Sequence, residues 1–335
     1  MESEHPELPE TPATHETQSS AHLCNPTVTP QQRHITAPHG FSSTVPQGLD
    51  PAYTALELII REVKARKSGL GPRTFQPWMV FPLAPTDLRA LDLYFQGDGY
   101  WEDKVRCDYF GSSQLFVLRL HSNPHEVIRA EVRYKLVSCL RTLPGRCPDE
   151  ASGRFAHKIC DCGSATVELA VGTHYSRHDP DISFRHPAAA YPGVIIEIAS
   201  SQKAEALEQL ANDYICGSSG KIHVVIGIEM EFGGKKGAKS RKATFSVWKP
   251  QWTTQDGKQS VHAECTAREM FRNEKGVPNL DAELSFSLSE FAPQAVVDRF
   301  EGFVDHTVQI SAKELCAYCE SAEQLEARTA EVEDM

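Results

Sequence analysis

The stretch Gly193-Val194-Ile195-Ile196-Glu197-Ile198-Ala199 decides the fold. Five of its seven residues are aliphatic, which is typical of a β-strand covered on both faces. Burying an unpaired carboxylate in such a strand costs on the order of several kcal/mol. Glu197 therefore requires a cation, a proton or a strong hydrogen-bond donor.

A second carboxylate precedes this strand, in Asp179-Pro180-Asp181-Ile182-Ser183-Phe184. If the two strands are neighbours with Asp181 opposite Glu197, their Cβ atoms lie about 5 Å apart, where like charges repel. A divalent metal between the carboxylates would remove both problems, so the pattern predicts a metal site. Two alternatives stay open: Asp181 as a turn residue after Pro180, and Glu197 as a buried carboxylate that is hydrogen-bonded or paired with an Arg, for which Arg177 and Arg185 are candidates.

The surrounding sequence predicts alternating helices and strands. Asn123, Pro124 and Glu126 have the order of a helix start, with Asn as the cap and Glu at the third position. Ser200 and Ser201 begin a second helix that ends at Gly217. Strands are expected at 115–120, 165–171, 181–185, 193–199, 222–228, 243–247 and 284–288, a loop at 144–163 and a helix at 311–327. The core order of helix, three strands, helix and two strands predicts an α/β fold with a mixed sheet.

The net charge of −11 is concentrated in the two ends of the chain. Residues 1–50 and residues 320–335 each contain six acids and one Arg, which leaves the middle close to neutral. Residues 1–50 are rich in polar residues and Pro and are expected to be disordered. We predict a single α/β domain over 51–310, with its core at about 115–250, and a C-terminal helix with an acidic tail over 311–335.

Ten cysteines without a signal-peptide pattern indicate reduced thiols, so an intracellular protein of the nucleus or cytoplasm is expected, not a secreted one. No apolar run approaches the roughly 18 residues that span a membrane, so no membrane partner is expected. Zinc is not the expected metal, because Cys160 and Cys162 beside Cys147 and His157 lack the usual ligand gap. The sequence does not predict an oligomeric state.

The two carboxylates and their order resemble the PD-(D/E)xK restriction-endonuclease-like superfamily, and more closely its Uma-type restriction endonucleases and their fungal relatives. Three stretches carry the resemblance: Ser122-Asn123-Pro124-His125-Glu126, Pro180-Asp181-Ile182-Ser183-Phe184, and Pro192 to Gln202 with Glu197 at its centre. The resemblance implies a restriction-endonuclease-like core in which a mixed central sheet is flanked by helices.

Carried over residue by residue, the resemblance implies that Asp181 and Glu197 are catalytic and hold Mg²⁺ or Mn²⁺. Glu126 would be a further metal ligand, with helix capping as its alternative role. The superfamily lysine two positions after the Glu is replaced by Ala199. Gln202 or Lys203 would take its place. We interpret His125 and His178 as ordinary surface or loop histidines.

A basic segment from Lys235 to Lys242 follows in a Gly-rich connection. Its cations are candidates for gripping a nucleic-acid backbone, with a solvated loop or a nuclear-import signal as the alternatives. They are Lys235, Lys236, Lys239, Arg241 and Lys242.

The sequence leaves two candidate functions, an enzyme and a binding module. The first is a metal-dependent endonuclease that hydrolyses phosphodiester bonds of DNA or RNA, with the third-motif lysine missing. The second is a catalytically degenerate nuclease fold that acts as a nucleic-acid or protein-binding module. An Arg beside Glu197 would favour the second, because it would leave no room for a cation.

Overall fold

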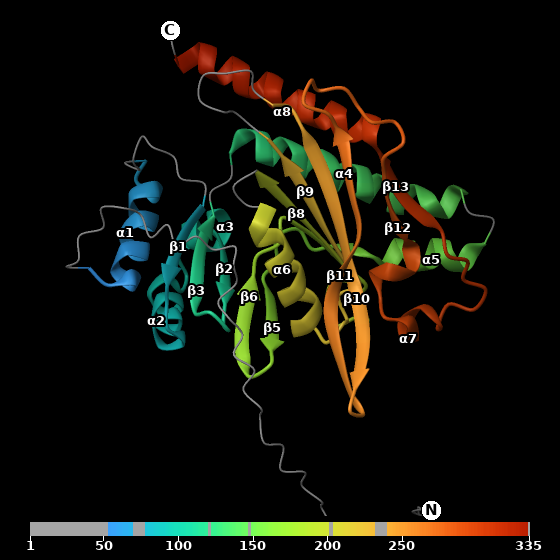
Figure 1. The fold of residues 1–335 in the computed structure, drawn as a ribbon, viewed down its shortest axis with the longest axis horizontal. Coiled ribbons are helices and arrows are strands. Elements are labelled where there is room, and N and C mark those ends of the chain that lie inside the picture. Colours follow the sequence, from blue (N-terminus) through green and yellow to red (C-terminus); the bar gives the residue numbers. More distant parts are fainter. Residues whose placement is uncertain are drawn as a thin grey trace, which may run out of the picture. The chain divides into compact units, whose positions relative to one another are not determined.

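The computed structural model describes residues 53–69, 78–119, 122–146, 149–200, 204–231 and 240–333. All of them belong to one unit, which extends from Ala37 to Met335. They form an α/β structure with a mixed sheet, an antiparallel sheet, a short two-stranded sheet and flanking helices (Figure 1). The predicted α/β class with a mixed sheet is confirmed at this level.

The larger sheet contains β4 (Cys160–Asp161), β7 (Ile182–Arg185), β8 (Val194–Ser200), β9 (Val224–Met230), β10 (Ala243–Gln255) and β11 (Lys258–Arg272). Their order across the sheet is β11-β10-β9-β8-β7-β4. β8 and β9 are parallel, and the other neighbours are antiparallel. The crossover between the two parallel strands is α6 (Ala204–Gly217), which ends at the predicted Gly217.

The decisive strand, β8, is covered on both faces, as its aliphatic sequence predicts. Val194 and Ile196 face a core that also contains residues of α4 (Asn123–Arg146) and α8 (Ala312–Glu333). Ile195 and Ala199 face a second core, which contains the buried side of α6. Glu197 has the parity of the second face and therefore points toward α6.

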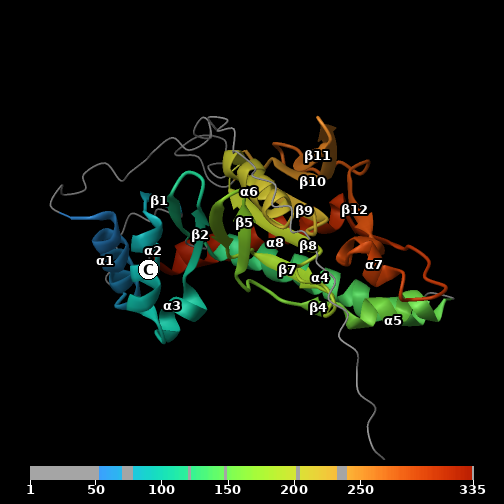
Figure 2. The ribbon, with the colours of Figure 1, turned by 90° about the horizontal axis from the view of Figure 1, so that it is seen from below.

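The second sheet contains β1 (Trp78–Pro82), β2 (Arg106–Phe110), β3 (Leu115–Arg119), β5 (Val167–Val171) and β6 (His174–His178). It is antiparallel, in the order β1-β3-β2-β6-β5. One face packs on α6, and the other packs on residues of α1 (Ala55–Lys67) and α2 (Pro85–Phe95). Figure 2 shows these helices and α3 (Gly99–Lys104) together beside β1 and β2.

The C-terminal part returns to the larger sheet. It contains β12 (Glu283–Ser287), η2 (Leu288–Phe291), α7 (Gln294–Val297) and β13 (Thr307–Ser311), followed by α8. β12 and β13 form the two-stranded sheet. α8 lies along α4 in Figure 1, and a salt bridge between Lys135 and Glu314 joins the two helices. None of the helices in the described part has an apolar stretch long enough to cross a membrane.

The strand expected at 165–171 forms, but in the other sheet. It is β5, which makes a hairpin with β6 through Gly172 in the left-handed region (φ +63°). The neighbour of β7 in the larger sheet is instead β4, a strand of two residues. A strand of two residues is too short to show an alternation of apolar and polar residues in the sequence. The sequence therefore predicted 165–171 at this position instead of β4.

The loop expected at 144–163 is wrong, because α5 (Glu150–Lys158) forms there. Asp149 caps it by accepting a hydrogen bond from the Ser152 amide at 2.7 Å. Gly153 lies so near Pro144 of α4 that an added Cβ would be 3.0 Å from the Pro144 Cα. Small residues at this contact allow α5 to pack closely against α4. They also weaken the apolar periodicity by which a helix is predicted from the sequence.

The strand expected at 243–247 is much longer in the structure. β10 continues to Gln255 and pairs with β11 over its whole length, whereas its pairing with β9 ends at Trp248. Pro250 therefore lies where β10 has only one partner strand, a position that tolerates a residue without an N–H. The sequence analysis did not predict β11.

Candidate functional site

The structure brings Asp181 and Glu197 together. In the antiparallel pairing of β7 and β8, Ile182 lies opposite Ile196, so Asp181 precedes β7 beside Glu197. The Ile198 amide donates to Oδ2 of Asp181 at 2.7 Å. The two residues are only 1% and 2% exposed. The predicted proximity of the two carboxylates is confirmed.

A guanidinium lies between these carboxylates. Nη1 of Arg119, at the end of β3, lies 2.9 Å from Oε2 of Glu197 and 3.8 Å from Oδ1 of Asp181. Nε of the same residue lies 3.2 Å from Oδ2 of Asp108 on β2. One buried cation from the five-stranded sheet thus faces three buried carboxylates, one from its own sheet and two from the larger sheet.

The remaining oxygen atoms of this cluster also have protein partners. The Tyr214 hydroxyl on α6 donates to Oε1 of Glu197 at 2.8 Å. Nε2 of His125 lies 3.0 Å from Oδ2 of Asp181. Each carboxylate is therefore held from at least two sides, which fixes its position.

A buried histidine extends the cluster toward α6. His178 places Nδ1 3.2 Å from Oδ1 of Asp108 and Nε2 3.3 Å from Oδ2 of Asp213. Burial alone would lower the pKa of His178, but its hydrogen bonds with the two carboxylates raise this pKa to about 9. A protonated His178 donates from both ring nitrogens and is the second cation of the cluster.

Burial also affects the pKa values of Glu197 and Arg119 at the centre of the cluster. Burial raises the pKa of Glu197 to about 8, and Arg119 opposes this shift. For Arg119, burial works against the charged form, but Asp108 and the two other carboxylates raise its pKa well above the ordinary value. Arg119 is therefore charged at neutral pH.

These residues do not fit a hydrated divalent ion in this arrangement. Mg²⁺ keeps several water molecules and takes only one or two protein carboxylates. Here a guanidinium occupies the space between the carboxylates, which are nearly excluded from solvent. Among the described residues, no group of three or more His, Cys, Asp or Glu is arranged to hold a metal ion. Magnesium or manganese stays an untested prediction.

Glu197 is paired with an Arg, as one alternative predicted, but the two arginines named as candidates were wrong. Arg177 pairs with Asp92 at 2.7 Å, and Arg185 is exposed, so neither reaches the carboxylate. The interpretation of His125 and His178 as surface or loop residues was also wrong, because they are 6% and 0% exposed. Arg119 comes instead from a strand that lies far away in the sequence.

Glu126 lies at the edge of the cluster. It accepts two hydrogen bonds from Arg129, at 2.7 and 3.0 Å, and lies 3.3 Å from Nδ1 of His125. It is linked to Asp181 through the imidazole of His125. The cap of α4 is Ser122, whose hydroxyl accepts from the His125 amide at 3.4 Å, and Asn123 is already in the helix.

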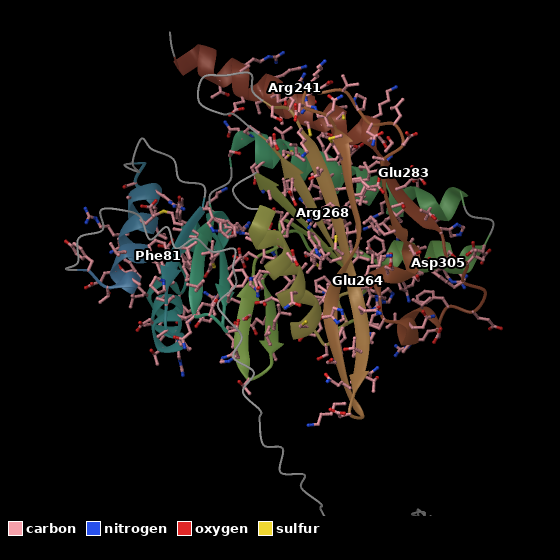
Figure 3. The ribbon with its side chains drawn as sticks, in the orientation of Figure 1. Phe81, Arg241, Glu264, Arg268, Glu283 and Asp305 are labelled. Atoms are coloured by element: carbon pink, nitrogen blue, oxygen red, sulfur yellow. The ribbon has the colours of Figure 1, made fainter. Side chains whose placement is uncertain are left out.

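Several predicted residues lie outside the described part: Gln202, Lys203, Lys235, Lys236 and Lys239. Two cations of the basic segment are described. Nε of Arg241 donates to Glu323 of α8 at 3.0 Å, and Figure 3 shows Arg241 beside this helix. Lys242 is half-buried just before β10. Of the cysteines weighed for zinc, Cys160 is exposed and Cys147 lies outside the described part.

Sequence reasoning missed most of the cluster: Asp108, Arg119, His178 as a paired cation, Asp213 and Tyr214. A signal was present for two of them. Asp108 and Arg119 are charged residues at positions in or beside apolar strands, in Arg106–Phe110 and Leu115–Arg119. The same argument that identified Glu197 applies to both, because a charge in a buried strand needs a partner.

No protein-family model matches the chain. No curated protein matches it either.

Proposed function

We propose that this protein is a catalytically silent nuclease-like domain that binds nucleic acid without cleaving it. The observation that carries the proposal is the position of Arg119, whose Nη1 lies 2.9 Å from Glu197 and 3.8 Å from Asp181. A guanidinium between these carboxylates neutralises them without offering a coordination site for water or phosphate.

The order of the elements in and around the larger sheet supports the proposal that the fold is nuclease-like. α4 is followed by β4, β7 and β8, then by α6, then by β9 and β10, with α5 inserted before β4 and the hairpin of β5 and β6, which belongs to the other sheet, inserted before β7. This is the order of helix, three strands, helix and two strands on which the resemblance rests, with β4 in place of the strand expected at 165–171. Asp181 directly precedes β7, and Glu197 lies on the neighbouring strand β8, which is the arrangement of the motif.

Two features support catalytic silence. Metal-assisted hydrolysis needs an ion that lowers the pKa of a bound water and polarises the phosphodiester. A guanidinium has no vacant coordination position and cannot replace it in that role. The motif lysine is also missing, and Ala199 at its position is 1% exposed and packed in the core with α6.

The position of the basic segment supports nucleic acid as the partner. The parallel strands β8 and β9 end together, with Ser200 opposite Met230. In the sequence, the segment from Lys235 to Lys242 lies between β9, which ends at Met230, and β10, which begins at Ala243. Contacts of lysines with phosphates are independent of base sequence, so we expect binding without sequence preference.

The proposal is tested by fluorescence anisotropy with labelled single- and double-stranded DNA and RNA between 50 and 200 mM salt. We expect affinity to fall with salt with a slope of roughly −2 to −3 for three phosphate contacts. The triple variant Lys235→Glu, Lys236→Glu and Lys239→Glu should lose binding. A matched control replaces Lys258, Lys275 and Lys313, three exposed lysines elsewhere, and should retain it.

A cleavage assay with Mg²⁺ or Mn²⁺ completes the test. We expect no cleavage by the wild-type protein. Cleavage by the wild type that disappears in both Asp181→Asn and Glu197→Gln would contradict the proposal that the protein is catalytically silent. It would support a metal-dependent endonuclease instead. If the protein binds none of the tested nucleic acids, the proposal that nucleic acid is its partner is contradicted. A protein-binding module is then favoured.

A further inference from the structure

We propose that a cavity at the start of β8 and β9 binds a small organic phosphomonoester, with Arg185 and Lys221 as the cations that hold the phosphate group. The cavity has a volume of about 580 Å³. Its lining includes Glu168 of β5, Arg185 of β7, Ala190, Tyr191 and Pro192 before β8, and Lys221 before β9. The proposal is independent of the function proposed above, because neither motif carboxylate lines the cavity and the basic segment follows the end of β9 in the sequence.

Backbone hydrogen bonds bring the walls of the cavity together. The Gly193 amide donates to the Phe184 carbonyl at 3.0 Å, and the Gly193 carbonyl accepts from the His223 amide at 2.9 Å. Arg185 directly follows Phe184, and Lys221 lies two residues before His223. The segments that carry the two cations are therefore joined through one glycine, at the edge of the sheet where the parallel strands β8 and β9 begin.

The lining of the cavity carries an excess of positive charge. Arg185 and Lys221 are exposed, and neither forms a salt bridge in the described part of the chain. The Lys221 ammonium lies 6.0 Å from the centre of the Tyr191 ring, which also lines the cavity. The carboxylate among the lining residues is Glu168, and it hydrogen-bonds with the Tyr175 hydroxyl. Two cations without a carboxylate partner match a phosphomonoester, which carries about −1.5 to −2 charges at pH 7, better than a carboxylate with its single charge.

The cavity is larger than a phosphate group alone requires. Its volume lies within the range of about 300–1,000 Å³ that is typical of small-molecule sites. Ala190, Tyr191 and Pro192 make part of its lining apolar. Such a lining favours a ligand in which the phosphate is attached to a ring, as in a mononucleotide. A free mononucleotide and the phosphorylated end of a nucleic-acid strand both present this chemistry.

The experiment titrates the full chain with AMP, with adenosine and with inorganic phosphate by calorimetry at pH 7.5. We expect saturable binding of AMP, and affinities at least about tenfold lower for adenosine and for inorganic phosphate. Arg185→Gln and Lys221→Gln should each weaken AMP binding by about ten- to hundredfold, because each removes a charge-assisted contact. The controls Arg89→Gln and Lys258→Gln, at exposed cations outside the cavity, should keep the affinity of the wild type.

Two further measurements separate the phosphate from the rest of the ligand. Ala190→Phe leaves both cations in place and fills part of the cavity from an exposed position. It should weaken AMP binding by at least about tenfold and leave the weaker binding of inorganic phosphate unchanged. Lowering the pH from 7.5 to 5 should weaken AMP binding by the wild type, because the phosphate loses its second negative charge at about pH 6.

Failure of the folded wild type to bind AMP saturably at millimolar concentration would overturn the proposal. Unchanged AMP affinity in the double variant Arg185→Gln, Lys221→Gln would also overturn it; both positions are exposed, and circular dichroism checks that the variants fold. A terminally phosphorylated oligonucleotide that displaces AMP when its unphosphorylated form does not would identify a strand end as the source of the phosphate. If neither form displaces AMP, the source is a free nucleotide, and equal displacement by both forms would overturn a phosphomonoester as the ligand.

Discussion

Arg119 and Glu197 are joined at 2.9 Å although they belong to different sheets. Arg119 ends β3 of the antiparallel sheet, and Glu197 lies in the middle of β8 of the mixed sheet. This hydrogen bond therefore connects the two sheets directly, beside the core that residues of both sheets share with α6. This pair of residues therefore has a structural role.

Replacing Arg119 should destabilise the fold strongly. We expect Arg119→Met to lower the free energy of unfolding by about 3–5 kcal/mol, because it leaves buried carboxylates uncompensated. Urea denaturation at pH 7 in the absence of divalent ions measures this loss. The control Arg106→Met, at a half-buried arginine that donates to the carbonyl of its neighbour Val105, should lose less than about 1 kcal/mol. Equal losses in both variants would contradict the assigned role.

The hydroxyl of Tyr214 should contribute through Glu197. We expect Tyr214→Phe to lower the free energy of unfolding by about 1–3 kcal/mol, because one oxygen of a buried carboxylate loses its donor. The measurement is chemical denaturation. Tyr134→Phe, at a ring that is 73% exposed, is the matched control and should be neutral. A neutral Tyr214→Phe would contradict this contribution.

Stability should fall as pH rises from about 6.5 to about 9. Burial opposes a charged His178, but Asp108 and Asp213 raise its pKa to about 9, so the folded protein holds this proton more tightly than the unfolded chain. The contribution is complete below pH 6.5 and is lost as pH rises through 9, with a limit of about 3 kcal/mol.

Glu197 changes stability in the same direction. Burial raises its pKa to about 8, so its contribution also disappears with rising pH, between about 4.5 and 8. The test is the free energy of unfolding at pH 6, 7.5 and 9 for wild type and His178→Gln. The variant should show a smaller fall between pH 7.5 and 9, whereas the exposed-residue control His174→Gln should follow the wild type. An unchanged fall in His178→Gln would refute the assignment.

Gly111 should tolerate no side chain. A Cβ built there would lie 1.9 Å from the carbonyl oxygen of Tyr175 on β6. We expect Gly111→Ala to cost at least about 2 kcal/mol, because the hairpin backbone must shift. Gly99→Ala, at the start of α3 with nothing within 4 Å, is the control and should be neutral or slightly stabilising. The measurement is thermal unfolding of both variants, and equal melting temperatures would contradict the prediction.

Glu323 should hold the C-terminal helix against β11. It accepts hydrogen bonds at 2.7 and 2.8 Å from Arg272, which is 2% exposed, and also binds Arg241. Glu323→Ala should cost about 3–5 kcal/mol and increase amide exchange in α8, since it leaves a buried guanidinium unpaired. Glu326→Ala, three residues further along the exposed part of α8, should change neither quantity.

The local composition of the sequence determined several features correctly. Five aliphatic residues around Glu197 predicted a doubly covered strand, and β8 is one. Gly217 predicted the end of α6, and the order of Asp181 and Glu197 predicted neighbouring strands. These features depend on periodicity and on residues that begin or end elements, which act over a few positions.

The tertiary structure alone decided what accompanies the two carboxylates. The buried environment of Glu197 required a cation, a proton or a donor, and the sequence could not say which. Arg119 is separated from Glu197 by 78 residues and reaches it only because β3 ends beside β8. The sequence by itself thus determined that a buried charge had to be compensated, because desolvation is a local property of the strand. Only the packing of the two sheets decided that an arginine lies there, because proximity between distant segments is a property of the fold.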